Sequence, residues 1–167
     1  MAALLAWLAA AQAARADDAI VVIANHELAE LEELSLPLLR QLYLGRRTRV
    51  DGRRIHWFEL PPGSASHRSF TRLALELSER ELERDWLEQA LSGGPLPPRE
   101  IPTAGELVRR VATRQGALAY LEWKVLRSLP KAGVKVIPLR VGERRLLPDD
   151  PGYPLRVREL PARAPGP

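Results

Sequence analysis

Apolar residues fall into short runs separated by polar turns. Residues 19–24 read Ala-Ile-Val-Val-Ile-Ala with no polar position, which predicts a strand buried on both faces. Further strands are predicted from the apolar runs at 55–60, 116–121, 134–139 and 153–157. The last of these carries Pro154, which favours the edge of a sheet because proline cannot donate to a neighbouring strand.

Apolar residues at helical spacing fill the intervals between these strands. Ser35 can cap a helix that Gly45 ends, and a second helix is predicted from about Ser66 to Leu77. Two capping boxes, Ser78 with Glu81 and Thr103 with Glu106, open the next two helices. The apolar face of the helix after Ser78 is expected to consist of Leu82, Trp86, Leu87 and Ala90. Strands and helices alternate, so the predicted class is α/β, with a mixed β-sheet flanked by helices.

The composition is that of one globular domain preceded by a different kind of segment. The chain has 167 residues, 46% of them hydrophobic, and no internal run of about 20 apolar residues that could span a membrane once the first segment is removed. Residues 1–16 are almost all Ala and Leu and end in Ala14-Arg15-Ala16, a small-x-small pattern. We interpret them as an export signal cleaved after Ala16, with cleavage after Ala13 as the second choice. An N-terminal helix of a cytosolic protein is the alternative.

These observations set the expected organisation. Residues 17–160 form the domain, and residues 161–167 are a disordered Pro-rich tail. The mature protein is expected in the periplasm. Within the predicted strand at 55–60, Trp57 and Phe58 alternate, so one of the two is expected to be buried and the other exposed.

Charge and chemistry exclude several classes of function. The formal net charge is +4, but Arg and Glu are interleaved, as in residues 79–84, and no arginine block carries interleaved aromatics. Nucleic-acid binding is therefore not expected. There is no cysteine, and His26, His56 and His67 lie far apart without metal-ligand or catalytic spacing. No catalytic residue, metal or cofactor is predicted, and the chain is not expected to be an enzyme.

The segment Pro62 to Phe70 offers the best candidate for ligand chemistry. A Pro-Pro-Gly turn leads into an amphipathic helix, whose first free N–H groups and dipole favour an anion. The hydroxyls and charges around them can add donors. The candidate anion-binding residues are Ser64, Ala65, Ser66, His67 and Arg68. The alternative is that Ser64 or Ser66 only caps the helix.

The order of several short motifs resembles the substrate-binding proteins of the phosphate ABC transporter. The apolar strand ending at Asn25 resembles the strand of that family that ends in Asn. The motifs that follow in the same order are Leu42-Tyr43-Leu44-Gly45, Asp51-Gly52 with Ile55, Ser64-Ala65-Ser66 with Phe70, Trp86 with Leu91-Ser92-Gly93 and Pro97-Pro98, Gly116-Ala117-Leu118-Ala119-Tyr120, and Tyr153-Pro154-Leu155. The resemblance implies a periplasmic-binding-protein-like fold and a phosphate or oxyanion ligand. It also implies an inner-membrane transporter or another envelope protein as partner.

Two departures from the family limit what the resemblance implies. Phosphate-trapping members have two lobes, whereas this chain has room for about one lobe of 100–150 residues. Leu60 and Pro62 stand where the family has an Arg and an Asp, so the bidentate charged donor is missing. We therefore expect weak oxyanion binding by the isolated lobe. The alternative is an envelope protein-interaction module that keeps the fold and has lost the ligand.

Overall fold

The computed structural model describes residues 17–157, so the predicted export signal 1–16 and tail 161–167 lie outside the described residues. The helices are α2 (Leu36–Tyr43), α3 (Ala65–Ala74), α4 (Glu79–Leu91), α5 (Ala104–Thr113) and α6 (Trp123–Arg127). The strands are β1 (Ile20–Asn25), β2 (Leu34–Ser35), β3 (Arg49–Val50), β4 (Arg53–Arg54), β5 (His56–Glu59), β6 (Arg99–Glu100), β7 (Ala117–Glu122), β8 (Val134–Ile137), β9 (Leu139–Val141) and β10 (Arg144–Leu146). Within this range, none of the helices has the length and apolar character needed to cross a bilayer.

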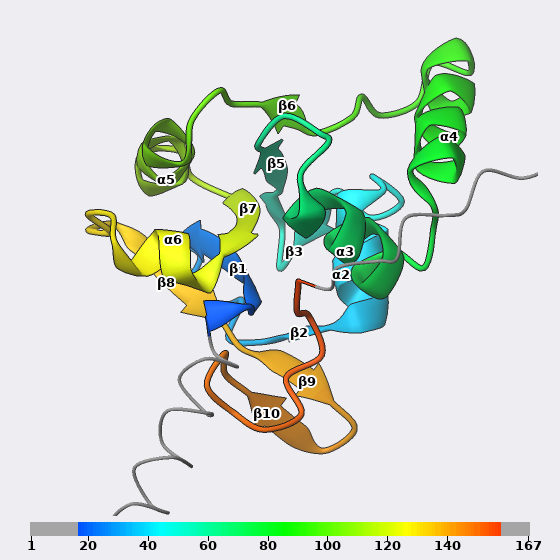
Figure 1. Ribbon diagram of the computed structural model, residues 1–167. Coiled ribbons are helices and arrows are strands. Elements are labelled where there is room, and N and C mark those ends of the chain that lie inside the picture. Colours follow the sequence, from blue (N-terminus) through cyan, green and yellow to red (C-terminus); the bar gives the residue numbers. More distant parts are fainter. Residues whose placement is uncertain (1–16, 158–167) are drawn as a thin grey trace, which may run out of the picture.

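A mixed five-stranded sheet forms the centre of the molecule, in the order β6-β5-β7-β1-β8. β5 runs parallel to β6 and β7, and β1 runs antiparallel to β7 and β8. All six residues of β1 are buried, which confirms the strand predicted over 19–24. Antiparallel neighbours on both sides and helices on both faces leave no part of β1 at the surface (Figure 1).

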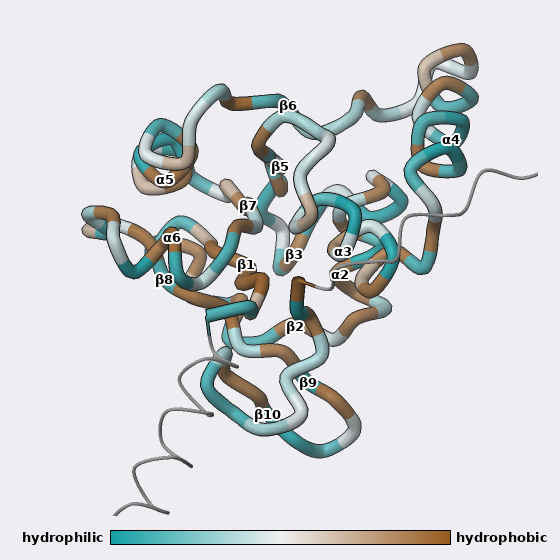
Figure 2. The backbone as a smooth tube through the Cα atoms, viewed as in Figure 1, coloured by the Kyte–Doolittle hydropathy of each residue, from teal (hydrophilic) through white to brown (hydrophobic). Residues whose placement is uncertain are grey.

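Two apolar clusters divide between the faces of this sheet. Val21 and Ile23 point to the cluster that contains α5 and α6, whereas Ile20 and Val22 point to the cluster that contains α2 and α3. Figure 2 shows the apolar colouring concentrated on β1 and on the inward sides of these helices. The predicted class, an α/β fold with a mixed sheet flanked by helices, is confirmed.

Two smaller sheets lie beside the main one, in the order β10-β9-β2 and β3-β4. The predicted strand 134–139 is divided between β8 and β9, because Pro138 interrupts the hydrogen-bonding pattern. The turn at Asp51-Gly52 joins β3 to β4, with positive φ at both residues.

The helix starts agree with the capping residues in the sequence. Ser35 caps α2, and Ser78 and Glu81 form the complete capping box of α4. Thr103 accepts a bond from the Glu106 N–H at the start of α5, which is the Thr103 half of the second predicted box. Side-chain caps are local interactions, so the sequence spacing alone predicts them well.

Four sequence predictions need correction. The helix predicted over 66–77 begins at Ala65 and ends at Ala74. Segment 153–157 contributes only an isolated bridge between Ala19 and Arg156 rather than a strand. Leu87 is 61% exposed and Ala90 is also exposed, because α4 packs only through Leu82 and Trp86. Trp57 and Phe58 are both buried, because helices cover both faces of the sheet at β5.

Candidate anion site

The predicted anion turn lies between the carboxyl end of β5 and the amino end of α3. Ser64 is the N-cap of α3, and its Oγ accepts a hydrogen bond of 3.0 Å from the His67 N–H. The Ser66 Oγ lies 3.0 Å from the Ser64 Oγ, so the two hydroxyls form a pair. The N–H groups of Ala65 and Ser66 have no acceptor among the described residues. The turn therefore both caps the helix and keeps two free backbone donors.

Arg68 lies beside this turn but bonds to the backbone of the loop. Its Nη1 donates to the Gly63 carbonyl oxygen at 2.7 Å, while the side chain remains exposed. A cation at this position adds to the positive end of the helix dipole. The other donors of its guanidinium are left for a ligand or for water.

The His67 ring points away from the turn and into the protein. His67 is only 6% exposed, and its Nδ1 lies 2.7 Å from the Tyr120 hydroxyl. Burial is the main cause that lowers the pKa of His67 below its usual range. The structure therefore brings Ser64, Ala65, Ser66 and the Arg68 guanidinium together at the turn and directs the His67 ring elsewhere.

A buried carboxylate completes the network that begins at His67. The Glu59 Oε2 accepts hydrogen bonds from Tyr43 and, at 3.2 Å, from Tyr120. On the other side of its ring, the His67 Nε2 lies 3.8 Å from a carboxylate oxygen of Glu79. These bonds tie the first turn of α3 to β5 and β7.

Burial dominates the titration of Glu59. It raises the pKa of this carboxyl from 4.5 to about 7, although the Tyr43 and Tyr120 hydroxyls act in the lowering direction. Aromatic rings enclose the group: Phe70 stacks on Tyr120 with centroids 3.7 Å apart, and Tyr43 packs edge-on against Trp57. Sequence reasoning missed Glu59; its signal was a single acidic residue in the apolar run at 55–60.

Leu60 and Pro62 are uncharged, although the family resemblance implies an Arg and an Asp at these positions. Leu60 is half-buried and packs against the cluster around α5, and Pro62 is exposed. The described residues contain no group of three or more acidic or histidine side chains that could hold a metal ion.

Solved structures with similar folds show where this architecture occurs. An ABC-type phosphate transport receptor from Vibrio cholerae aligns with 73% of the chain at 16% identity and a TM-score of 0.54. PstS from Borrelia burgdorferi aligns with 73% at 14% identity and a TM-score of 0.57. The chain has the fold of phosphate receptors. It spans under half of their length, 46% and 47% respectively.

A third similar structure was solved with its ligand. It is a protein from Clostridium perfringens, assigned as a phosphate ABC transporter substrate-binding protein, with bound phosphate. It aligns with 73% of this chain and 45% of its own length, at 15% identity and a TM-score of 0.54. No family model matches the sequence, and no curated protein matches it.

Proposed function

We propose that the chain is an exported, periplasmic module that binds phosphate or a similar oxyanion at the turn before α3. The observation that carries the proposal is the pair of free N–H groups, at Ala65 and Ser66, at the amino end of a buried helix. The hydroxyls of Ser64 and Ser66 and the Arg68 guanidinium add donors from the same turn. An inner-membrane transporter or another envelope protein would be the partner.

His67 has a supporting part in this proposal. Its backbone N–H is occupied by Ser64, and its ring is held by Tyr120, so it anchors the first turn of α3 rather than contacting the anion. An anchored turn keeps its N–H groups aimed in one direction before the ligand arrives, which reduces the ordering cost of binding.

The affinity of this site alone is expected to be low. Ser64 and Arg68 are exposed, and charged contacts exposed to water contribute little. With Leu60 in place of the family's Arg, the site also lacks the bidentate donor that a phosphate-trapping receptor would use. Binding in the millimolar range is expected unless a second lobe or chain covers the turn.

Isothermal titration of the mature protein with phosphate and with sulfate tests the proposal. We expect heat that saturates at millimolar anion for the wild type, and saturation at a several-fold higher anion concentration for Ser64→Ala combined with Ser66→Ala, which removes the two hydroxyl donors and keeps the backbone N–H groups. Thr103→Ala is the matched control, because it removes the N-cap of α5 and leaves the anion turn unchanged. No heat from the wild type at millimolar phosphate would overturn the proposal and leave the protein-interaction alternative.

A further inference from the structure

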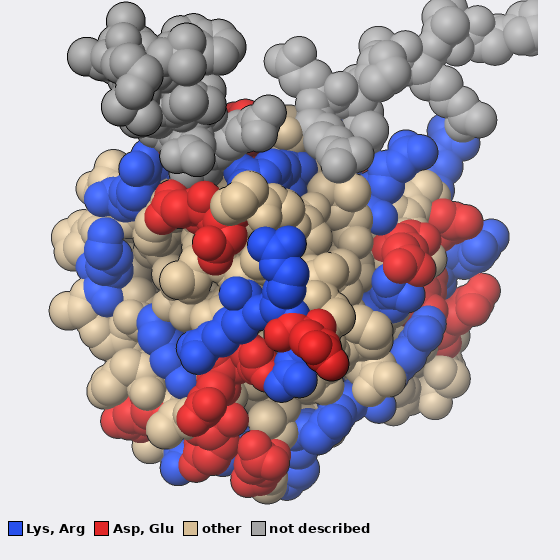
Figure 3. Space-filling view, turned by 90° about the horizontal axis from the view of Figure 1, so that it is seen from below, with Lys and Arg blue, Asp and Glu red and all other residues tan. Residues whose placement is uncertain are grey.

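A second region of the molecule concentrates positive charge more strongly than the turn does. On the face shown in Figure 3, Lys and Arg side chains alternate with Asp and Glu, as expected of a solvated surface. A hollow of about 430 Å³ at the amino end of β5 differs from this mixed surface because its charged lining residues are all basic. It is lined by Arg47, Arg54, Arg99, Arg110 and Arg114 together with His56, and the described residues that line it include no Asp or Glu. We call it the arginine pocket.

Most of this charge has no counter-ion within the protein. Among the residues that the structure describes, Arg54, Arg99 and Arg110 form no hydrogen bond or ion pair through their guanidinium groups. By contrast, Arg53, next to the pocket, pairs with Glu30 at 3.3 Å. Guanidinium groups that share one concave surface without carboxylates repel one another, and an anion entering the hollow would relieve that repulsion.

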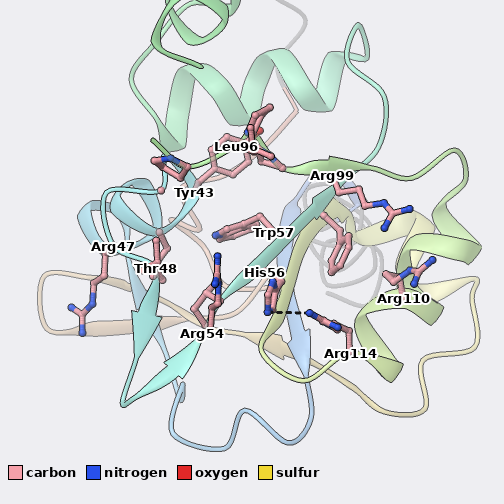
Figure 4. Close-up of a pocket in the computed structure, with 17 residues that line it drawn as sticks. Tyr43, Arg47, Thr48, Arg54, His56, Trp57, Leu96, Arg99, Arg110 and Arg114 are labelled. Atoms are coloured by element: carbon pink, nitrogen blue, oxygen red, sulfur yellow. Dashed lines mark hydrogen bonds between the residues drawn. The ribbon is translucent and has the colours of Figure 1, made fainter. Parts of the chain in front are cut away.

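His56 and Arg114 contact each other in the pocket wall. The Arg114 Nη2 lies 3.4 Å from the His56 Nε2, drawn as the dashed line in Figure 4. A neutral imidazole can accept from a guanidinium at this atom, and burial together with Arg114 and Arg54 keeps the pKa of His56 low. The positive charges of Arg54 and Arg114 therefore contribute to the lowered pKa of His56.

The backbone beneath the arginines is held rigidly. The His56 N–H donates to the Gly116 carbonyl at 2.9 Å, which joins the starts of β5 and β7. At Gly116, where φ is +71°, a Cβ would lie 2.1 Å from the Arg54 carbonyl oxygen, so glycine is required for this close approach. The backbone of Arg54 is thus held against that of Gly116, and Figure 4 shows His56 between the Arg54 and Arg114 side chains.

An apolar wall lies across from part of this charge. Leu96, Pro97 and Pro98 form one side of the hollow, and Trp57 contributes its ring (Figure 4). Leu96 is 78% exposed, so its side chain is accessible to a ligand in the hollow. The pocket therefore offers several spaced guanidinium groups and an apolar contact surface, the combination that suits an anion with an organic body.

We propose that the arginine pocket binds an organic di- or polyphosphate, with its phosphates on Arg54, Arg110 and Arg114 and its apolar part against Leu96. The three guanidinium groups come from β4, the carboxyl end of α5 and the residue after it, so a ligand with more than one anionic group can contact several of them at once. This site is separate from the anion turn: no residue of 63–68 lines the pocket, which lies at the opposite end of β5.

Titration calorimetry with two probes, ADP and pyrophosphate, tests this proposal. ADP carries both a diphosphate and a flat organic body, and it is expected to bind more tightly than pyrophosphate. Arg54→Ser with Arg114→Ser should weaken both probes by about tenfold or more, since each change removes charged donors. Arg99→Ser with Arg110→Ser gives a second, independent test on other elements. Leu96→Ser should weaken ADP alone.

Matched controls separate this site from general electrostatics and from the anion turn. Arg109→Ser removes an exposed arginine from α5 that does not line the pocket, so it should leave both affinities unchanged. Ser64→Ala with Ser66→Ala should also leave ADP binding unchanged. No ADP binding by the wild type, equal affinities for ADP and pyrophosphate, or equal weakening by Arg109→Ser would each overturn the proposal.

Discussion

At the scale of single residues, Glu59 connects the candidate site to the stability of the fold. Its pKa is about 7 in the folded protein against an ordinary 4.5, so the folded state holds this proton more tightly than the unfolded chain does. Stability from this group is fully present below about pH 4.5 and is lost as the pH rises through 7. The shift corresponds to about 3 kcal/mol between those limits.

We expect Glu59→Gln to flatten this dependence. The free energy of unfolding of the wild type, measured by urea denaturation, should fall relative to that of the variant as the pH rises from 4.5 to 7.5. His67, whose pKa is lowered, acts in the opposite direction by favouring folding as the pH rises, but it is present in both proteins and largely cancels in their difference. A constant difference between the two proteins across this range would contradict the assignment.

Tyr120 offers a second test of the buried network. Tyr120→Phe keeps the ring that stacks on Phe70 but removes the hydroxyl between His67 and Glu59. Both of those buried groups would lose a partner, so the free energy of unfolding should fall by about 1–3 kcal/mol. Calorimetric melting measures this loss. In the double variant with Glu59→Gln the two losses should be non-additive, because both residues belong to one network.

What the sequence could predict at this scale depended on whether a contact was local. Ser78 was identifiable as a cap, and the cap of α3 was narrowed to Ser64 or Ser66, because such a side chain accepts from an N–H three residues ahead along the chain. The inward direction of the His67 ring depends on Tyr120, which is 53 residues away, and no local pattern encodes it. For the same reason Glu59 was missed, since its partners come from α2 and β7.

At the scale of elements, the junction of β4, β5 and β7 depends on one close approach. Gly116→Ala would place a Cβ against the Arg54 carbonyl and force a left-handed backbone on alanine. We expect a loss of about 3 kcal/mol or more in the free energy of unfolding, from strain and overpacking together. Gly52→Ala is the control: its φ is +81°, but nothing lies within 4 Å, so about 1 kcal/mol is expected. Equal losses would show that the contact contributes nothing.

A strand or helix could be predicted from its apolar residues where neighbouring elements cover all of them. β1 was predicted correctly because a fully apolar run fits only a position covered on both sides. The apolar face expected for α4 was partly wrong, since Leu87 has helical spacing but no neighbouring element to cover it. Tyr153 lies in the segment that was wrongly predicted as a strand. It is buried, and its hydroxyl donates to the Ile20 carbonyl, so this segment joins β1 through a side chain rather than through backbone strand pairing.

At the scale of the whole molecule, the residues directly after the predicted cleavage site take part in the fold. Asp17 pairs with Arg127, and Ala19 is fully buried with its carbonyl bonded to Trp123, so the fold is engaged from the first residues after Ala16. Cleavage after Ala16 would leave this body intact. We expect the chain, produced in a Gram-negative host, to be recovered by osmotic shock with Asp17 as its first residue.

Mass spectrometry and N-terminal sequencing of the shock fraction measure this directly. Small side chains at the first and third positions of Ala14-Arg15-Ala16 are what the cleavage pattern requires, so Ala14→Lys with Ala16→Lys should block processing. Ala2→Ser is a control at a position outside the cleavage pattern and should be processed normally. Recovery of the uncleaved wild-type chain from the cytosol would overturn the export proposal. It would not affect oxyanion binding at Ser64 and Ser66, which can be titrated in the protein from either compartment.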